Sequence, residues 1–401
     1  MRIGYFSYEF PPDNGKGGIG TYVEQIAKAM AAAGFDVHVF AGSPQRELTE
    51  ITAGYKVHWV QCNDLTAYKN RVVAIFEKHH SSFPFNFIES PEIGGNAWAV
   101  KNKFPKLPLV VRLHGSNYLV EKLKKSYVPV TAKLRFVLGA LRRFTWDLGY
   151  WRKYIKEQDE DYQFVLTADY LTAPTEAMKQ WVVENWQIKP SKIFVLMNIF
   201  NAPKSFLEIP ALKVPLQKQV VFFGRLNVLK GLVNATKAMK LILAQHPDWH
   251  FKVIGDDGPG PSNGTTMKSW MQQQLQDNIQ RVTFVNGLQY ELLPREISTA
   301  SIVLLPSLFE SFSYTCAEAM AAGKAIVGSK NGGMAVLIEN EISGLLVNPK
   351  KPAEIHYAIK KLIEEEQGCC MLGSNARQHV LQDFDPQKTA SQFVSYYQQV
   401  V

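Results

Sequence analysis

The feature that most constrains this chain is an alternation of short β-type runs with amphipathic helical segments, which occurs twice along the sequence. In the first half, residues 2–7, 37–41 and 109–113 are typical strands, and helical patterns separate them. Residues 198–215 interrupt the pattern with three prolines and no periodic run, after which the alternation resumes at 219–224. Such alternation is typical of a parallel sheet covered by helices on both faces. The sequence therefore predicts an α/β protein with two doubly wound, Rossmann-like domains.

Domain boundaries follow from the interruption and from the last helical pattern. We expect an N-terminal domain over residues 1–203 and a C-terminal domain over residues 204–384. A final helical pattern follows Asp385-Pro386, with its apolar residues on one face. We therefore expect residues 385–401 to form a helix that crosses back to the N-terminal domain.

Composition narrows the class of protein. Of the 401 residues, 46% are hydrophobic and 20% are charged, which excludes a mostly disordered chain. No run of 18 apolar residues occurs, and residues 1–10 lack a basic-then-apolar leader, so we expect a cytoplasmic protein.

The four cysteines are Cys62, Cys316, Cys369 and Cys370. They contain no CxxC pair, which argues against a disulfide framework or a zinc site.

The positive charge is concentrated in one segment. The chain has 44 Lys and Arg against 36 Asp and Glu residues, a net charge of +8. Ten of the basic residues and two of the acidic ones lie in 117–156, so this segment accounts for the whole excess. A nucleic-acid-binding protein would carry a broader basic surface, and we expect no nucleic-acid partner.

Within that segment, residues 134–155 predict an amphipathic helix. Its apolar residues recur at helical spacing: Leu134, Val137, Leu138, Leu141, Phe144, Leu148, Trp151 and Ile155. Trp146 and Tyr150 add aromatic side chains of the kind found at membrane interfaces. Two interpretations stay open. The basic segment either contacts an anionic membrane or a lipid-linked acceptor, or packs on its own domain with a solvated basic face.

A glycine loop follows the first predicted strand. Gly15, Gly17 and Gly20 fit the pattern G-x-G-x-x-G, but the first glycine lies eight residues beyond Ser7, and no acidic residue ends the strand at 37–41. Both departures argue against a dinucleotide-binding site. The loop precedes a helix, whose positive end would suit a diphosphate. A tight turn without a ligand is the alternative.

Two basic residues follow the strand at 219–224. Arg225 and Lys230 are expected at the carboxyl edge of the sheet, where α/β proteins bind ligands. Two cations at this place could neutralise a departing diphosphate. A pair of solvated surface charges would have the same sequence.

A pair of glutamates forms the strongest motif of the second half. Glu310 lies in a loop after a strand, and Glu318 lies within the helix that Ser313 caps and Gly323 ends. Eight helical residues span ~12 Å, more than the roughly 5–9.5 Å between paired hydrolytic carboxylates. We therefore expect two separate roles, with each carboxylate accepting hydrogen bonds from different sugar hydroxyls.

With these motifs in this order, the chain resembles a family-four retaining glycosyltransferase of the GT-B fold, in which two Rossmann-like domains face each other across a cleft. The resemblance covers essentially the whole chain, and the double-glutamate block is its most specific part. The motifs that carry it are Gly17-Gly18-Ile19-Gly20, Arg112-Leu113-His114-Gly115, Gly224-Arg225 with Lys230-Gly231, Glu310 and Glu318, Gly332-Gly333, and Gly344-Leu345-Leu346-Val347.

The resemblance implies a role for each matching residue. Glu318 would hold the ribose hydroxyls of a nucleoside-diphosphate sugar, and Glu310 would contact the transferred sugar. Arg225 and Lys230 would bind the diphosphate. His114 would hydrogen-bond the donor sugar and support charge developing in the transition state. Further donor contacts are expected at Gly17, Gly18, Leu288, Phe312, Ser313, Tyr314 and Thr315.

Two departures concern the sugar site and the metal. Ser311 and Ser313 stand where the family often has glycines, which leaves the identity of the sugar open. Asp256-Asp257 are adjacent and do not form the D-x-D motif of metal-dependent transferases. We expect no obligatory metal or other cofactor, because the cations and helix ends would neutralise the diphosphate.

The implied function is a hexosyltransferase that moves a sugar from a nucleoside diphosphate to a hydroxyl of a saccharide or lipid-linked acceptor, with retention. UDP-glucose is the first donor expected and GDP-mannose its rival. The implied setting is bacterial surface polysaccharide or glycolipid biosynthesis at the inner face of the membrane. Two other functions stay open at this point: a nucleotide-sugar epimerase or hydrolase, and a catalytically inactive nucleotide-binding subunit.

Overall fold

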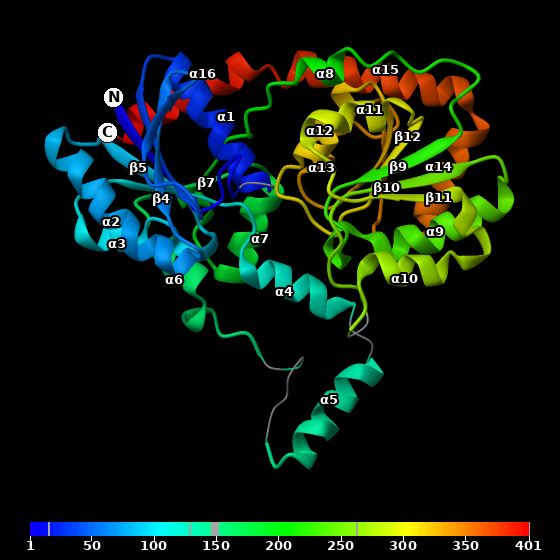
Figure 1. Cartoon of the computed structure of the whole chain (residues 1–401), viewed down its shortest axis with the longest axis horizontal. Helices are drawn as coiled ribbons and strands as arrows, with labels where there is room; N and C mark the ends of the chain where they lie inside the picture. The colour runs from blue at the N-terminus through cyan, green and yellow to red at the C-terminus, as the bar shows by residue number, and fades with distance from the viewer. Residues whose placement is uncertain (15–16, 128–129, 146–150, 152, 262–263, 401) are drawn as a thin grey trace. The chain divides into compact units, whose positions relative to one another are not determined.

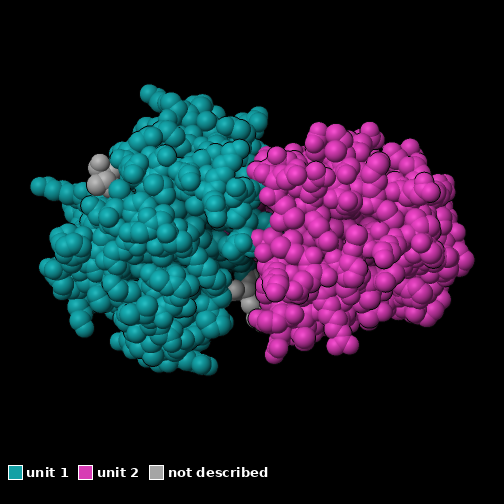
Figure 2. All heavy atoms as spheres, turned by 90° about the horizontal axis from the view of Figure 1, so that it is seen from above, with its two compact units in different colours: residues 1–117, 155–201, 384–401 teal, residues 118–154, 202–383 magenta. Residues whose placement is uncertain are grey.

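The structure consists of two compact units, each built around one sheet (Figures 1 and 2). Unit 1 comprises residues 1–117, 155–201 and 384–401, and unit 2 comprises residues 118–154 and 202–383. The computed structural model describes residues 1–14, 17–127, 130–145, 151, 153–261 and 264–400. Both units have the doubly wound α/β architecture that the sequence predicts, so the predicted fold class is confirmed.

The sheet of unit 1 has eight strands in the order β3-β4-β2-β1-β5-β6-β7-β8. They are β1 Arg2–Ser7, β2 Asp36–Ser43, β3 Thr49–Thr52, β4 Tyr55–Gln61, β5 Phe87–Pro91, β6 Leu109–Arg112, β7 Tyr170–Ala173 and β8 Ile193–Val195. All neighbours pair in parallel except β3, which pairs antiparallel with β4. The strand β3 was not predicted from the sequence. It is a short edge strand, joined to β4 by Ala53 and Gly54, both with positive φ. Such an edge carries no long apolar run to reveal it.

Helices flank this sheet (Figure 1). They are α1 Gly18–Ala32, α2 Leu65–Ser82, α3 Trp98–Lys103, α6 Glu160–Leu166, α7 Glu176–Trp186 and α16 Pro386–Val400. In α1 the buried residues Tyr22, Ile26 and Met30 recur every four positions, as an amphipathic helix requires. In α16, Phe393 and Tyr397 are buried against the same unit, where the Tyr397 hydroxyl donates to Glu89 at 2.7 Å.

The sheet of unit 2 has six parallel strands in the order β11-β10-β9-β12-β13-β14. They are β9 Gln219–Phe223, β10 His250–Ile254, β11 Val282–Val285, β12 Ile302–Leu305, β13 Ala325–Ser329 and β14 Leu345–Val347. The α-helices of this unit between residues 202 and 383 are α8 Lys204–Leu207, α9 Leu232–Gln245, α10 Met267–Gln274, α11 Leu293–Ser298, α12 Tyr314–Ala321, α13 Met334–Leu337, α14 Pro352–Glu364 and α15 Glu366–Asp383. The apolar faces of α9 and α14 form the core of the unit together with the central strands.

The basic segment differs from its prediction. It forms α4 Asn117–Ser126 and α5 Val130–Arg142, so the single helix predicted over 134–155 is wrong. Phe144 adopts a left-handed φ of 55°, and the N–H of Thr145 donates back to the carbonyl of Ala140 at 3.0 Å. This hydrogen bond over the helix end terminates α5, although the apolar spacing continues beyond it. The predicted stripe residue Leu148 and the predicted aromatics Trp146 and Tyr150 lie outside the described residues.

Residues 118–154 belong to unit 2 by their contacts, whereas the expected N-terminal domain of residues 1–203 included them. Leu123 and Tyr127 pack against the core of unit 2, and the Asn234 side chain donates to the Tyr127 hydroxyl at 2.9 Å. Among the helices of the described residues, none is long and apolar enough to cross a membrane.

Candidate functional site

The loop that carries Glu310 is held by two glycines. The N–H of Gly333 donates to the carbonyl oxygen of Glu310 at 2.6 Å. Gly332 has a φ of 80°, and a Cβ there would lie 2.2 Å from the same oxygen. Both positions therefore exclude larger residues, and they fix the backbone from which the Glu310 side chain extends.

Glu310 contacts a second predicted residue. The Nζ of Lys230 lies 2.5 Å from Oε1 of Glu310, and both side chains are partly buried. Lys230 ends the short helix η5 Val228–Lys230, whose first turn is capped by Asn227, and Gly231 follows with a φ of 73°. A Cβ on Gly231 would lie 1.8 Å from the carbonyl oxygen of Pro306, so only glycine permits this approach. The fold thus brings together two charges that are 80 residues apart.

Arg225 lies at the same end of the sheet. It follows β9 and Gly224, whose φ is 139°, and its side chain is exposed. It makes no ion pair with the residues that the structure describes, and it is therefore available to an anionic ligand.

Glu318 is the more deeply buried glutamate. Its side chain is 7% exposed, and the Tyr290 hydroxyl donates to its Oε1 at 2.6 Å. Burial raises the pKa of Glu318 to about 7, and the hydrogen bond from Tyr290 acts in the opposite direction. Tyr290 was missed by the sequence analysis, because no spacing rule links a turn residue to a helix 28 positions later. The nearest predicted donor contact was Leu288, which is half-buried two residues earlier.

The N-terminus of α12 is capped as predicted. The Ser313 Oγ accepts a hydrogen bond from the N–H of Cys316 at 3.3 Å and lies 3.1 Å from Oγ1 of Thr315. Ser313 adopts a φ of 94°, a left-handed conformation that costs a residue with a Cβ about 1–2 kcal/mol. Phe312 and Tyr314 precede and follow Ser313 in the sequence, and their rings pack edge to face against each other with centroids 5.1 Å apart.

In unit 1, His114 follows β6 in a loop that Glu92 holds. The backbone N–H of His114 donates to both carboxylate oxygens of Glu92 at 2.8 Å, and the N–H of Gly115 donates to Oε1 at 2.6 Å. Glu92 is fully buried, which raises its pKa to about 8. Glu92 was not predicted from the sequence, because its role depends on a loop 22 residues further along the chain.

The His114 imidazole is neutral at physiological pH, because burial and the neighbouring Arg112 lower its pKa to about 3. Its ring packs edge-on against Tyr22, with centroids 5.0 Å apart. The Nε2 atom is buried and has no hydrogen-bond partner among the described residues. A buried polar atom without a partner costs free energy, so this nitrogen is available to a ligand hydroxyl.

The two glycines at the start of α1, Gly17 and Gly18, differ in the atoms that surround them. A Cβ on Gly17 would lie 2.9 Å from Oε2 of Glu9, whereas a Cβ on Gly18 would meet no atom within 4 Å. The Glu9 carboxylate is the end of a flexible side chain that can move aside, so packing requires glycine at neither position. Gly15 lies outside the described residues.

The described residues contain no group of three or more His, Cys, Asp or Glu side chains that could hold a metal ion. The site residues are thus grouped within each unit: Lys230 with Glu310, and Glu318 with Tyr290, in unit 2; His114 with Glu92 in unit 1. Within unit 2, the two carboxylates and the cations Arg225 and Lys230 are suited to binding a sugar and an anion.

Comparisons with known proteins agree with this description. A profile of the glycosyltransferase family 4 matches residues 16–202, and one of the glycosyl transferases group 1 matches residues 209–379. A D-inositol 3-phosphate glycosyltransferase of Corynebacterium kroppenstedtii is 30% identical over 54% of this chain and 50% of its own length. The match thus spans about half the length of that relative.

Two solved structures match over the whole chain. The sucrose-phosphate synthase of Thermosynechococcus elongatus has a TM-score of 0.74 and 19% identity, covering 100% of this chain and 99% of its own. HepE of Anabaena, solved with UDP-glucose, has a TM-score of 0.66 and 18% identity, covering 100% of both chains. At these identities the two likenesses concern the fold.

Proposed function

The chain belongs to the family-four glycosyltransferases of the GT-B fold, and from this premise we propose that it is a retaining hexosyltransferase that uses a nucleoside-diphosphate sugar. The acceptor is a hydroxyl of a saccharide or lipid-linked saccharide. The observation that carries the proposal is the arrangement in unit 2, where Lys230 contacts Glu310 and Tyr290 contacts Glu318, and where the exposed Arg225 follows the carboxyl end of β9.

UDP-glucose is our first choice of donor. HepE, which shares the fold over its whole length, was solved with this nucleotide sugar. We propose that Glu318 accepts hydrogen bonds from the ribose hydroxyls, that Leu288 contacts the base, and that Arg225 and Lys230 bind the diphosphate. GDP-mannose is the rival donor.

In the proposed reaction, the bond between the anomeric carbon and the diphosphate oxygen breaks, and the acceptor oxygen bonds to the same face of that carbon. The leaving diphosphate takes the acceptor proton, so no carboxylate serves as base. Arg225 and Lys230 neutralise the charge that develops on the diphosphate. Glu310 contacts the transferred sugar, and His114, being neutral, contributes a hydrogen bond at Nε2 rather than a full charge.

The test is a thermal-shift screen with UDP, GDP, ADP and their sugars, followed by product analysis with oligosaccharide and lipid-linked acceptors. We expect UDP and UDP-glucose to raise the unfolding temperature by mass action, and the product to keep the donor's anomeric configuration. Activity should persist with excess chelator. Absence of a shift with every nucleotide would contradict the proposal. Consumption of the donor without acceptor would favour an epimerase or hydrolase, and binding without any transfer would favour an inactive subunit.

We also infer that α5 contacts an anionic membrane, where a lipid-linked acceptor would lie. Four apolar residues of this helix, Val130, Leu134, Leu138 and Leu141, are 43–64% exposed. At about 100° per residue they share one face, and basic residues such as Lys133 and Arg142 lie at its borders. An exposed apolar face bordered by cations is typical of helices that lie in the interface of anionic lipid.

Vesicle sedimentation checks this contact. We expect binding to vesicles of anionic phosphatidylglycerol that weakens with salt and is lost in the double variant Arg142→Glu, Arg143→Glu. The matched control reverses two exposed lysines elsewhere in unit 2, Lys237→Glu and Lys350→Glu, and should bind as the wild type does. Equal binding to neutral phosphatidylcholine vesicles would argue against an electrostatic contact, and binding by the Arg142, Arg143 variant would argue against α5.

A further inference from the structure

The hydrogen bond between Tyr290 and Glu318 joins an exposed residue to a buried one. Tyr290 lies in the short helix η7 Tyr290–Leu292 and is 50% exposed, whereas Glu318 lies in α12 and is 7% exposed. The phenolic oxygen lies 2.6 Å from Oε1 of the carboxylate. The buried ring of Phe206 packs against the ring of Tyr290, with centroids 6.0 Å apart. The second carboxylate oxygen, Oε2, has no hydrogen-bond partner among the described residues.

The described residues form no ion pair with this carboxylate. Lys230 pairs with Glu310, and the Arg377 guanidinium of α15 donates to the carbonyls of Ala321 and Ile209. Burial alone would therefore favour the neutral acid, and it raises the pKa of Glu318 to about 7. The hydroxyl of Tyr290 is the group in contact with Glu318 that favours the ionised form.

We propose that Tyr290 is a positioning residue for the donor nucleoside: its hydroxyl holds Oε1 of Glu318, so that Oε2 is presented, ionised, to the ribose hydroxyls. This inference rests on the proposed function, because it assigns the ribose to Glu318. It adds that the strength and the pH dependence of nucleotide binding are set by a residue outside the motifs that mark the donor site. The alternative role, in which Tyr290 occupies the place of the ribose, predicts the opposite effect of removing its hydroxyl.

The test is isothermal titration calorimetry of UDP-glucose with the full chain between about pH 6 and pH 8, below the pH at which the uracil ring begins to ionise. For the wild type we expect affinity to fall as the pH falls through about 7, because Glu318 takes up a proton. In Tyr290→Phe the ionised carboxylate loses its hydrogen bond. We expect roughly ten-fold weaker binding at neutral pH and a binding midpoint at higher pH.

Two further variants make the result specific. Glu318→Gln removes the titrating group, and its weaker binding should be independent of pH over the same range. Tyr357→Phe, on the outer surface of α14 where Tyr357 is 70% exposed, is the matched control and should bind as the wild type does. Thermal unfolding of each variant verifies that it is folded; Tyr290→Phe keeps the ring that packs on Phe206.

The outcomes separate this inference from the proposed function. Wild-type affinity and pH midpoint in Tyr290→Phe, or tighter binding, would overturn the positioning role while nucleotide binding stands. Unchanged pH dependence in Glu318→Gln would also overturn it, since another group would then titrate. If the wild type binds no nucleoside-diphosphate sugar at all, the proposed function fails first and this inference fails with it.

Discussion

Ser313 shows how a single residue carries opposing contributions to stability. Its left-handed φ of 94° costs about 1–2 kcal/mol, whereas its Oγ caps α12 by accepting from the N–H of Cys316. Replacing a serine cap by glycine costs a few tenths of a kcal/mol, and replacing it by alanine costs about 1 kcal/mol. The two substitutions therefore distinguish the free-energy cost of backbone strain from the stabilisation that the N-cap hydrogen bond provides.

We expect Ser313→Gly to be at least as stable as the wild type, by up to about 0.5 kcal/mol, because relief of strain exceeds the lost cap and the added chain entropy. Ser313→Ala keeps the strain and loses the cap, and we expect a loss of about 1 kcal/mol. Urea unfolding measures both values. An alanine variant more stable than the glycine variant would show that the left-handed backbone is not strained.

His114 allows a prediction that distinguishes binding from turnover. In His114→Ala we expect kcat to fall by about 10²-fold with a smaller change in KM, because the lost hydrogen bond to the sugar matters most as the glycosidic bond breaks. The measurement is steady-state kinetics with the donor that the thermal-shift screen selects.

The pH profile adds a control for His114. With a pKa lowered to about 3, the imidazole stays neutral across the neutral range, and the remaining activity of His114→Ala should show the same pH profile as the wild type. A profile whose acidic limb disappears in the variant would mean that His114 titrates, which contradicts its buried, neutral state.

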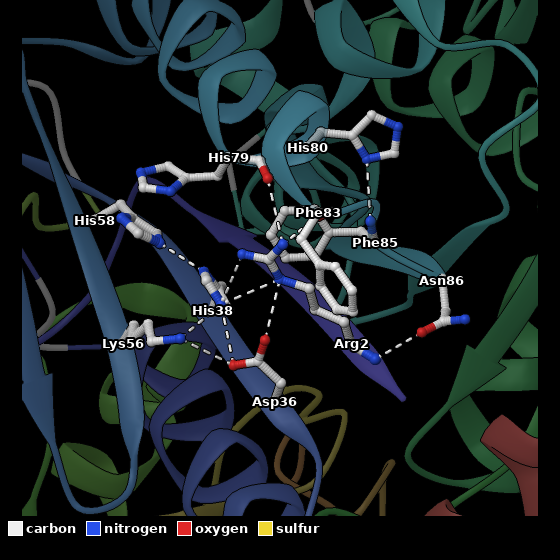
Figure 3. A network of polar contacts seen from close by, with 10 residues as sticks. All are labelled: Arg2, Asp36, His38, Lys56, His58, His79, His80, Phe83, Phe85 and Asn86. Atoms are coloured by element: carbon white, nitrogen blue, oxygen red, sulfur yellow. Dashed lines mark hydrogen bonds and ion pairs between the residues drawn. The ribbon is translucent and has the colours of Figure 1, made fainter.

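At the scale of elements, strands β1, β2 and β4 and helix α2 of unit 1 meet in a buried polar network (Figure 3). The Nδ1 of His38 lies 2.7 Å from Nε2 of His58, whose Nδ1 faces the Thr49 hydroxyl at 2.9 Å. On its other side His38 faces Asp36 and Arg2, with Lys56 pairing with Asp36 at 3.1 Å. Burial and the nearby cations lower the pKa of His38 to about 4 and that of His58 to about 2.

This network makes unit 1 sensitive to acid. Both histidines accept protons more readily in the unfolded chain, where their pKa is near 6.5, than in the folded one. Their contribution to stability is therefore complete above pH 6.5 and is lost as the pH falls toward 4. We expect the free energy of unfolding to fall by at least about 2 kcal/mol between these values.

Urea unfolding at pH 7 and pH 5 measures the effect. His38→Asn removes one titrating group and keeps a polar partner for His58, so it should reduce the pH dependence of stability. The control, His250→Gln on the exposed start of β10, should leave the dependence unchanged. Equal stability of the wild type at both pH values would contradict a neutral, buried pair.

At the scale of the whole molecule, unit 1 is assembled from three separate stretches of the chain, the last of which is the C-terminal helix. Tyr397 of α16 donates to Oε2 of Glu89, and Tyr22 of α1 donates to Oε1 at 2.6 Å. Glu89 is 2% exposed, and burial raises its pKa. The two phenols are the hydrogen-bond donors that satisfy this carboxylate.

We therefore expect Tyr397→Phe to destabilise unit 1 by about 1–3 kcal/mol, because a buried acceptor loses a partner. Hydrogen exchange of the amides in β1 and β5 measures the change within this unit, and Tyr357→Phe on the surface of unit 2 serves as the control. Unchanged exchange in β1 and β5 would show that α16 contributes little to the stability of the sheet.

Elements with a local hydrophobic period could be predicted from the sequence, whereas individual contacts between residues far apart in the chain could not. The buried strand β1 and the stripe of α1 follow from local spacing, and Gly231 and Gly332 stand where backbones approach closely. Glu92 and Tyr290 escaped prediction, because their partners lie 22 and 28 residues away. The end of α5 was not predicted for another reason. The apolar spacing continues past Arg142, but a hydrogen bond from the N–H of Thr145 to the carbonyl of Ala140 ends the helix.

Local patterns of apolar and polar residues are enough to specify a doubly wound α/β chain with two sheets, because the side-chain periods of strands and helices are properties of the backbone alone. The same patterns, with the glutamates and cations in their order, point to the family. The raised pKa of Glu318, the neutrality of His114 and the grouping of 118–154 with unit 2 depend on the tertiary structure. Desolvation and hydrogen bonding depend on residues that meet only when distant parts of the chain pack together.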